Sequence, residues 1–373
     1  MKRIILVVAA MLFSSFAFAG TVKLGALFAV TGPAGYLGMP EKQTLEMLVE
    51  EANAQGGING DKIELVFYDT QGMENRTLNY FKRLVTKDKV SAIIGPTRTG
   101  STLVIKDMAE RYKVPLISCA ASRKIVEPVS KYVYKTPQSD IQVAEKLYEY
   151  LVSKNKTKIA IITAQSGYGE TGKQALIDIA EEYPVDIIIQ EKFNDTDKDM
   201  TAQLAKIKEA KPDAVICWGV GPAPAIVARN AKQLGIDNLY MTQGVASKKF
   251  INLAGDAAEG IKLTAGRLMV AEQLEEGDKY KDVLIDYKNA YEKKFDDSVS
   301  VFGGHAYDAF HLFKIAYEKA NGNMDKFLEE LESIKGFIGI AGEFNMTPED
   351  HTGLSKDAFV IVEIQNGDFV LVE

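Results

Sequence analysis

The sequence predicts an α/β protein built from two doubly wound units, each a parallel sheet with helices on both faces. Short β-branched runs alternate with longer amphipathic runs from residue 22 onward, and the same alternation starts again at residue 158. The length of 373 residues agrees with two domains of ordinary size. The segment YKTPQSD, at residues 134–140, is the first expected boundary between the two units.

In the first unit we expect four strands, at residues 22–30, 62–69, 91–95 and 114–118. Apolar residues at helical spacing lie between these strands. Leu45, Leu48, Val49 and Ala52 indicate one helix, and Leu78, Phe81, Leu84 and Val85 indicate a second. A third helix is expected over residues 103–112.

The second unit repeats the pattern with strands expected at residues 158–164, 185–193, 213–219 and 238–243. The helices between them are predicted near residues 173–182, 200–210 and 223–234. Residues 280–320 should form two long amphipathic helices. The chain should end in a β-hairpin over residues 359–373, turning at Asn366-Gly367.

The first twenty residues, MKRIILVVAAMLFSSFAFAG, have the organisation of a secretory signal peptide. A positively charged start precedes the apolar run Ile4–Phe13, and Ala17-Phe18-Ala19 is a small-x-small cleavage signal. We expect residues 1–19 to be removed and the mature protein to be soluble in the periplasm. A retained anchor is the alternative, although the apolar run is shorter than the roughly 20 residues of a membrane span.

The amino-acid composition limits which kinds of fold and binding partner are expected. The chain is 46% hydrophobic and 25% charged, as expected of a globular protein with large cores. Its net charge of −7 argues against nucleic acid and anionic lipid as partners. Only two cysteines are present, Cys119 and Cys217, which excludes a disulfide scaffold but leaves a single bond between them open.

Three loops at expected strand ends are rich in glycine, serine and threonine: GPTRTGST (95–102), SCAAS (118–122) and QSGYGETG (165–172). In open parallel sheets, ligands bind outside the carboxyl ends of the strands. Free N–H groups and hydroxyls in such loops suit a carboxylate or another small anion. Helix capping alone explains any one loop, but three loops in one chain favour a ligand cleft.

Other chemistry is weakly indicated. GYGETG at 167–172 matches a dinucleotide fingerprint with Glu191 as its acid, so a dehydrogenase is an alternative. The motif opens the second unit rather than the first, and export separates the protein from the cytoplasmic cofactor pool. His305 and His311 are expected to be packing or surface residues rather than metal ligands. Trp218 ends an expected strand and is either a core residue or a ligand contact. We expect no catalytic residue, cofactor or metal.

Segments spread over the whole mature chain resemble the periplasmic leucine/isoleucine/valine-binding proteins, the receptors of branched-chain amino-acid ABC importers. The matching segments, in order, are KLGALFAVTGPAGYLG, EANAQGGINGDKIELVFYDTQG, IIGPTRTGST, VPLISCAAS, SGYGETG and HAYDAFHLF.

This resemblance implies a type I periplasmic-binding fold, in which a three-crossing hinge joins two lobes around one ligand cleft. The N-terminal lobe would comprise residues 20–137 and 267–345, and the C-terminal lobe residues 138–266 and 346–373. Closure would be a hinge motion recognised by membrane permease subunits. A disulfide between Cys119 and Cys217 would lock that hinge, so we expect two free thiols. We also expect the protein to be a monomer.

Carried over to this sequence, the family's carboxylate clamp falls on Thr99, Ala120 and Ser122. A ligand contact from the second lobe falls on Tyr168. Gln243 stands where the family places an acid for the ligand's ammonium. The resemblance thus implies an intact anion half of the site.

The rest of the implied site differs from the family pattern. Gly221 replaces a tyrosine, and Leu37 replaces an aromatic residue for which Tyr36 could substitute. The function expected is therefore an ABC importer's receptor for a branched-chain amino acid or a related small carboxylate. A receptor for a non-amino-acid carboxylate or amide, in transport or in sensing, is the alternative.

Overall fold

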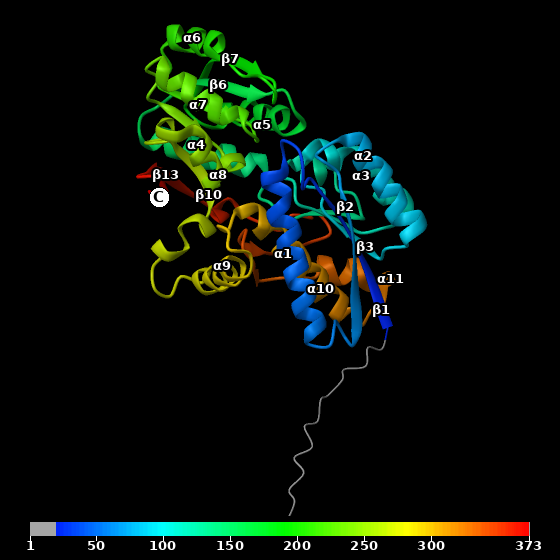
Figure 1. Cartoon of the computed structure of the whole chain (residues 1–373). Coiled ribbons are helices and arrows are strands. Elements are labelled where there is room, and N and C mark those ends of the chain that lie inside the picture. Colours follow the sequence, from blue (N-terminus) through cyan, green and yellow to red (C-terminus); the bar gives the residue numbers. More distant parts are fainter. Residues whose placement is uncertain (1–19, 373) are drawn as a thin grey trace, which may run out of the picture.

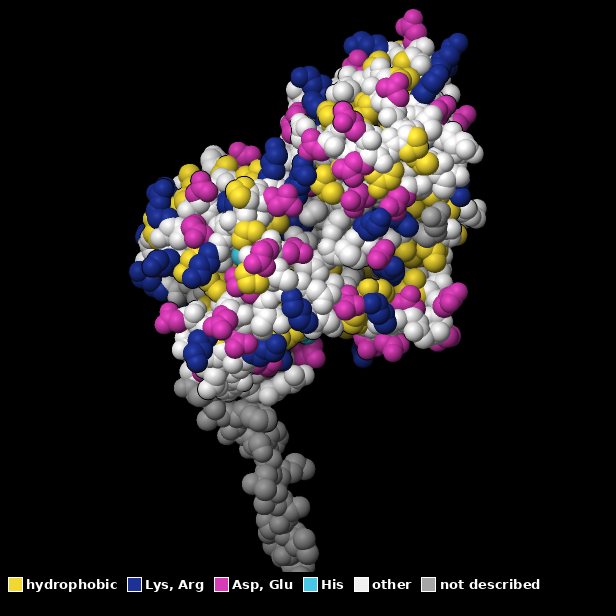
Figure 2. Space-filling model, turned by 180° about the vertical axis from the view of Figure 1, so that it is seen from behind, with side chains coloured by type: hydrophobic (Ala, Val, Ile, Leu, Met, Phe, Trp, Pro, Cys, Tyr) yellow, Lys and Arg dark blue, Asp and Glu magenta, His cyan; other side chains and the backbone are white. Residues whose placement is uncertain are grey.

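The computed structural model describes residues 20–372 and has two α/β lobes, as predicted (Figure 1). Residues 1–19, where the predicted signal peptide falls, and residue 373 lie outside the described residues. Within the described part, no helix is both long enough and apolar enough to cross a membrane. Figure 2 shows acidic and basic side chains interspersed over both lobes on the face it presents.

The first sheet is parallel, with strand order β2-β1-β3-β4-β5. Its strands are β1 (Gly20–Phe28), β2 (Asp61–Asp69), β3 (Ala92–Ile94), β4 (Leu116–Ser118) and β5 (Val133–Lys135). The strand order reverses between β1 and β3, where Leu24 of β1 pairs with Ala92 of β3. In sheets of this kind the crevice beside such a reversal is where ligands bind.

Helices from both ends of the chain cover this sheet (Figure 1). One face carries α1 (Gly35–Ala54), α10 (Val301–Lys319) and α11 (Met324–Glu332). The other face carries α2 (Glu74–Arg83) and α3 (Thr99–Tyr112). The predicted apolar face of α1 is buried in the core. Residues 301–332 therefore return to the first sheet after the chain has built the first five strands of the second, β6 to β10.

The second sheet has strand order β14-β13-β10-β9-β8-β6-β7. Its strands are β6 (Lys158–Ala164), β7 (Asp186–Phe193), β8 (Ala214–Trp218), β9 (Leu239–Met241), β10 (Lys262–Gly266), β13 (Phe359–Gln365) and β14 (Asp368–Leu371). The predicted terminal hairpin adds β13 antiparallel to β10, and β14 pairs antiparallel with β13 at the edge of the sheet. Asn366 and Gly367 have φ values of 52° and 73°, as a two-residue hairpin turn requires.

Helices α4 (Asp140–Ser153) and α5 (Gly167–Asp178) cover one face of the second sheet. The other face carries α6 (Thr201–Ala210), α7 (Ala223–Gln233) and α8 (Lys248–Ala254). Helix α9 (Lys281–Phe295) packs against α1 and the segment that follows β10. A short antiparallel ladder joins β11 (Phe337–Ile338) to β12 (Glu343–Phe344).

The chain passes between the two sheets three times: after β5, after β10 and after β12. Hydrogen bonds join the segment after β5 to α10 and to the loop between β11 and β12. Gln138 donates from Nε2 to the carbonyl oxygen of Ala341 over 2.6 Å, and Thr136 donates from Oγ1 to the carbonyl oxygen of His305 over 2.9 Å. The residue boundaries of the lobes stay a prediction.

The strand β5 was not predicted from the sequence, and there is a physical reason for this. Its last residue, Lys135, is fully buried, and its ammonium donates a 2.6 Å hydrogen bond to the carbonyl oxygen of Pro137. A lysine in a three-residue strand hides the apolar pattern that marks a buried strand. The expectation of two free thiols is confirmed, because Cys119 and Cys217 are both buried and unpaired.

Candidate ligand-binding cleft

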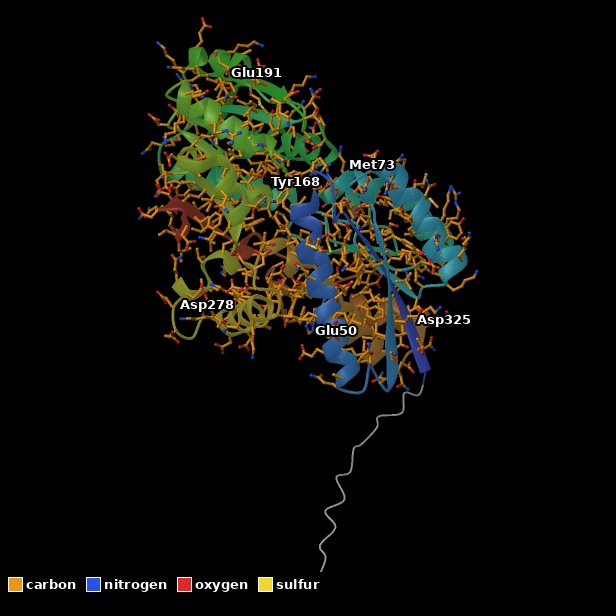
Figure 3. All side chains as sticks on the ribbon, viewed as in Figure 1. Glu50, Met73, Tyr168, Glu191, Asp278 and Asp325 are labelled. Atoms are coloured by element: carbon orange, nitrogen blue, oxygen red, sulfur yellow. The ribbon has the colours of Figure 1, made fainter. Side chains whose placement is uncertain are left out.

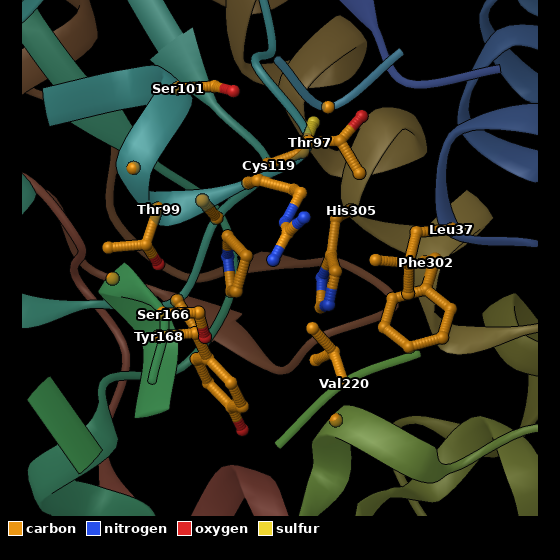
Figure 4. Close-up of a pocket in the computed structure, with 18 of the residues that line it drawn as sticks. Leu37, Thr97, Thr99, Ser101, Cys119, Ser166, Tyr168, Val220, Phe302 and His305 are labelled. Carbon is orange, nitrogen blue, oxygen red and sulfur yellow. The ribbon is translucent and has the colours of Figure 1, made fainter. Parts of the chain in front are cut away.

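A cavity of about 250 Å³ lies between the two lobes (Figure 4). Loops at the carboxyl ends of β3, β4, β6, β8 and β9 form most of its wall, together with α1 and α10. Its lining residues include Leu37, Glu74, Thr97, Arg98, Thr99, Gly100, Ser101, Ala120, Gln165, Ser166, Gly167, Tyr168, Val220, Gln243, Phe302 and His305. The place and the size suit one small ligand.

The N-terminus of α3 faces this cavity. The first residues of the helix, Thr99, Gly100 and Ser101, line the wall, and no side chain caps the helix. The first N–H groups of a helix have no partner within it, and they carry the positive end of its dipole. Ser101 is 1% exposed, and its hydroxyl has no partner in the protein. This end of the cavity therefore offers several donors to an anion.

A second helix N-terminus approaches from the other lobe. Ser166 caps α5 by accepting a 3.3 Å hydrogen bond from the N–H of Gly169. A Cβ atom built on Gly167 would lie 2.9 Å from the backbone nitrogen of Gly100, so the two helix ends touch. Figure 4 shows Thr99 and Ser166 on the same side of the cavity, at the left of the view. Two positive helix ends meeting at one cavity are stabilised by a negative group between them.

Contacts between the lobes also border the cavity. The guanidinium of Arg98, in the loop after β3, lies 2.7 Å from the carboxylate of Asp195, in the loop after β7. The hydroxyl of Tyr36 accepts a hydrogen bond from the N–H of Gly221 and lies 3.5 Å from the carbonyl oxygen of Gly244. These contacts join the two lobes at the border of the cavity.

The remaining polar wall is neutral and buried. Tyr168 shares a 3.3 Å hydrogen bond with the hydroxyl of Thr242, and burial raises the pKa of its phenol above the ordinary value. Gln243 has no partner in the protein for either side-chain atom. His305 has none for Nδ1. Burial, with a smaller contribution from the charge of Lys135, lowers the pKa of His305 to about 3, so the ring is uncharged near neutral pH.

Five of the eight residues that the sequence nominated line the cavity: Leu37, Thr99, Ala120, Tyr168 and Gln243. Ala120 is less free than expected, because its N–H donates a 3.1 Å hydrogen bond to the hydroxyl of Ser118. The roles of these residues in binding stay predictions.

Three nominated residues lie outside the cavity lining. The hydroxyl of Ser122 accepts a hydrogen bond from the N–H of Lys124, so it caps a turn. Gly221 borders a small adjoining gap rather than the cavity itself. Trp218 is fully buried, with its ring where a Cβ atom on Gly172 would lie. Of the two readings of Trp218, the structure favours the core residue.

The cavity residues that were not nominated include Arg98, Phe302 and His305. Arg98 lies inside the GPTRTGST loop. The loop was predicted to bind ligand because of its glycine, serine and threonine residues, and Arg98 itself was not predicted to line the site. Phe302 and His305 come from α10, whose return to the first sheet no local pattern reveals. Phe302 packs edge-on to Tyr36, with ring centroids 5.8 Å apart, and supplies the aromatic wall that Leu37 lacks.

Close packing explains why two positions of the dinucleotide-like motif, Gly169 and Gly172, are glycine. A Cβ atom on Gly169 would lie 1.9 Å from the carbonyl oxygen of Ala164, and one on Gly172 would lie 2.0 Å from the ring of Trp218. Glu191 forms a 3.0 Å ion pair with Lys206. Figure 3 places Glu191 toward the outer end of the second lobe, whereas Tyr168 lies where the lobes meet.

Comparison with known proteins agrees with this architecture. The model of the family described as "Periplasmic binding protein" matches residues 21–368. A leucine-, isoleucine-, valine-, threonine- and alanine-binding protein of Pseudomonas aeruginosa is 27% identical, over 97% of this chain and 92% of that protein.

Solved structures show the same likeness. An extracellular ligand-binding receptor of Rhodopseudomonas palustris has a TM-score of 0.88 at 26% identity, covering 94% of this chain and 99% of its own. The substrate-binding protein of a branched-chain amino acid transporter from Streptococcus pneumoniae, solved with isoleucine, has a TM-score of 0.82 at 25% identity, covering 94% and 97%. The chain belongs to the periplasmic binding protein family, among the relatives of the Leu/Ile/Val-binding proteins.

Proposed function

We propose that this protein is the periplasmic substrate-binding component of an ABC importer. It would bind a branched-chain amino acid or a related small carboxylate in the cleft between its lobes and deliver it to permease subunits in the inner membrane. The single observation that supports this most directly is the cavity at which the N-termini of α3 and α5, from different lobes, meet. The relatives, an amino-acid-binding protein and a branched-chain amino acid transporter's substrate-binding protein, agree with it.

In this proposal the ligand's carboxylate lies at the N-terminus of α3. The hydroxyls of Thr99 and Ser101 and the free N–H groups of the first turn are its donors. Ser166 and Tyr168 approach from the second lobe. Because donors come from both lobes, ligand binding would stabilise the closed arrangement, which is how a hinge protein reports occupancy.

The first test is a thermal-shift screen of the protein purified from a periplasmic extract. A ligand that binds the folded state raises the melting temperature by mass action. The screen contains leucine, isoleucine, valine, the matching deaminated acids and simple amides, with titration calorimetry for any hit. We expect a carboxylate-bearing compound to bind, and its methyl ester to bind at least tenfold more weakly. Binding of an amide in preference to every carboxylate would contradict the proposal.

Export and transport are tested separately. Intact-mass analysis of the periplasmic protein should show a chain that begins at Gly20, because Ala17-Phe18-Ala19 is the predicted cleavage signal. Deletion of the gene should abolish high-affinity uptake of the ligand found in the screen. Unchanged uptake, with a transcriptional response to the ligand that disappears instead, would favour the sensory alternative.

A further inference from the structure

Besides Ser101 at the α3 end, Gln243 and His305 of the cavity wall carry buried polar atoms that have no hydrogen-bond partner in the protein. Both Oε1 and Nε2 of Gln243 are unpartnered, and so is Nδ1 of His305. Each of these residues is only 7% exposed. Native proteins leave few buried polar groups without a hydrogen bond, because each one costs about 1–3 kcal/mol. Since both residues line the same cavity, a polar group of the ligand is the natural partner for both.

The charge of this wall limits what that polar group is. Gln243 is neutral, and His305 is uncharged near neutral pH because burial lowers its pKa to about 3. Glu74 is the only carboxylate among the described residues that line the cavity. Its Oε1 lies 2.3 Å from where a Cβ atom on Gly100 would be, so it is at the α3 end. An ammonium group placed at Gln243, away from Glu74, would thus be buried beside neutral atoms, which is costly.

The side of the cavity on which His305 lies also carries apolar side chains. Figure 4 shows His305 on the same side of the cavity as Leu37, Phe302 and Val220. Leu37 and Phe302 are buried residues of the first lobe's helices, and Val220 follows β8 in the second lobe. A ligand here would therefore need an apolar skeleton that carries one small neutral polar group.

We propose that the cleft takes a small carboxylate that bears a hydroxyl group and no ammonium. The carboxylate lies at the N-termini of α3 and α5, and the hydroxyl bonds to Gln243 and His305. A hydroxyl donates one hydrogen bond and accepts others. It can therefore bond both to the Gln243 amide, which offers a donor and an acceptor, and to the neutral imidazole of His305. This inference rests on the proposed function and narrows its ligand class.

The test measures binding of one five-carbon skeleton with its substituent varied. The probes are pentanoate, its 2-, 3-, 4- and 5-hydroxy derivatives as sodium salts, and 2-aminopentanoate, with leucine, isoleucine and valine alongside. Titration calorimetry on the exported protein gives each dissociation constant. We expect one hydroxypentanoate to bind at least tenfold more tightly than both pentanoate and 2-aminopentanoate.

Matched variants then locate the hydroxyl. Gln243→Leu should remove most of the preference for the hydroxypentanoate over pentanoate. His305→Phe should reduce the same preference. Gln165→Leu is the control, because Gln165 also lines the cavity but is exposed and already donates a 3.1 Å hydrogen bond to Asn194. Circular dichroism and the melting temperature show that each variant is folded.

The outcomes separate this inference from the proposed function. Tighter binding of 2-aminopentanoate or of the branched-chain amino acids would overturn the inference and leave the proposed function standing. Equal binding of pentanoate and its best hydroxy derivative would also overturn the inference. If none of these carboxylates binds, both the inference and the proposed function fail. A preference for the hydroxyl that survives in Gln243→Leu and in His305→Phe would overturn the assignment to this wall.

Discussion

The two ends of the cavity are built from different kinds of polar group. At the α3 end, Thr99, Gly100 and Ser101 begin a helix with no side-chain cap, and Arg98 brings a guanidinium already paired with Asp195. At the other end, Gln243 and His305 are neutral, buried and without partners. Helix ends attract an anion without a full counter-charge, whereas a neutral wall rejects any full charge. The cleft is therefore suited to a ligand that is charged at one end only.

The largest effect should come from the α3 end. Thr99→Val removes a hydroxyl donor to the ligand's carboxylate, and a hydrogen bond to a charged group contributes about 1.5–3 kcal/mol. We expect the dissociation constant, measured by calorimetry, to rise by about tenfold or more.

Ser122→Ala is the matched variant, because the Ser122 hydroxyl caps a turn outside the cavity lining. It should weaken binding much less than Thr99→Val. An equal or larger loss in Ser122→Ala would restore the clamp that the family resemblance implies and would move the anion site toward β4.

Changing the neutral end should alter ligand preference. Gln243→Glu places a carboxylate where an ammonium could pair with it, and charge-assisted hydrogen bonds are about twice as strong as neutral ones. The preference for leucine over 4-methylpentanoate, which lacks only the ammonium, should rise by about tenfold.

The wild-type protein provides the baseline for that comparison. If it already prefers leucine by about a hundredfold, roughly 2.7 kcal/mol, then an acid elsewhere serves the ammonium and the contrast between the two ends is wrong. Gln165→Glu, a change at the exposed glutamine of the same cavity, controls for added negative charge.

The neutrality of His305 predicts a dependence of stability on pH. Its pKa is about 3 in the folded chain against 6.5 for an ordinary histidine, so the unfolded chain binds more protons between these values. The free energy of unfolding should therefore fall as the pH drops below about 6.5, by at most about 1.4 kcal/mol per pH unit for this group. His311, whose pKa burial lowers to about 4, acts in the same direction.

Urea unfolding at pH 6.5 and 5.5 measures this slope. His305→Gln should flatten it, and His311→Gln should flatten it separately, because each removes one titrating group. A slope that is the same in wild type and His305→Gln would mean that His305 is not held neutral by its surroundings. In that case the wall could carry a positive charge at low pH.

The smallest effect should come from the ion pair between the lobes. The side chains of Arg98 and Asp195 are 24% and 28% exposed, so solvent screens their attraction, and such pairs contribute at most about 1 kcal/mol. Asp195→Asn should weaken ligand binding by about fivefold or less, more at low salt than at high salt.

The control is Glu191→Gln, which breaks a pair with Lys206 inside the second lobe. It should leave ligand binding unchanged. If Asp195→Asn strengthens binding instead, Arg98 is released to the ligand's carboxylate, and the α3 end would be a site with a full positive charge.

Much of this protein could be predicted from local sequence. The alternation of strand and helix gave the α/β class and most of the element positions, because hydrophobic periodicity records which side of an element is buried. The turn at Asn366-Gly367 followed from the backbone those residues tolerate. The loops that hold Thr99 and Tyr168 were found because they follow strands and contain small polar residues.

Only the tertiary structure decided the rest. His305 and Phe302 reach the cavity because α10 packs on the first sheet although it follows strands β6 to β10 of the second sheet in the chain. Arg98 and Asp195 are 97 residues apart and meet across the cleft. Ser122, which follows a strand like Thr99, turns its hydroxyl to Lys124 instead. Periodicity reports burial but not which distant surface buries a residue, so the identity of the neutral wall depended on how the two lobes meet.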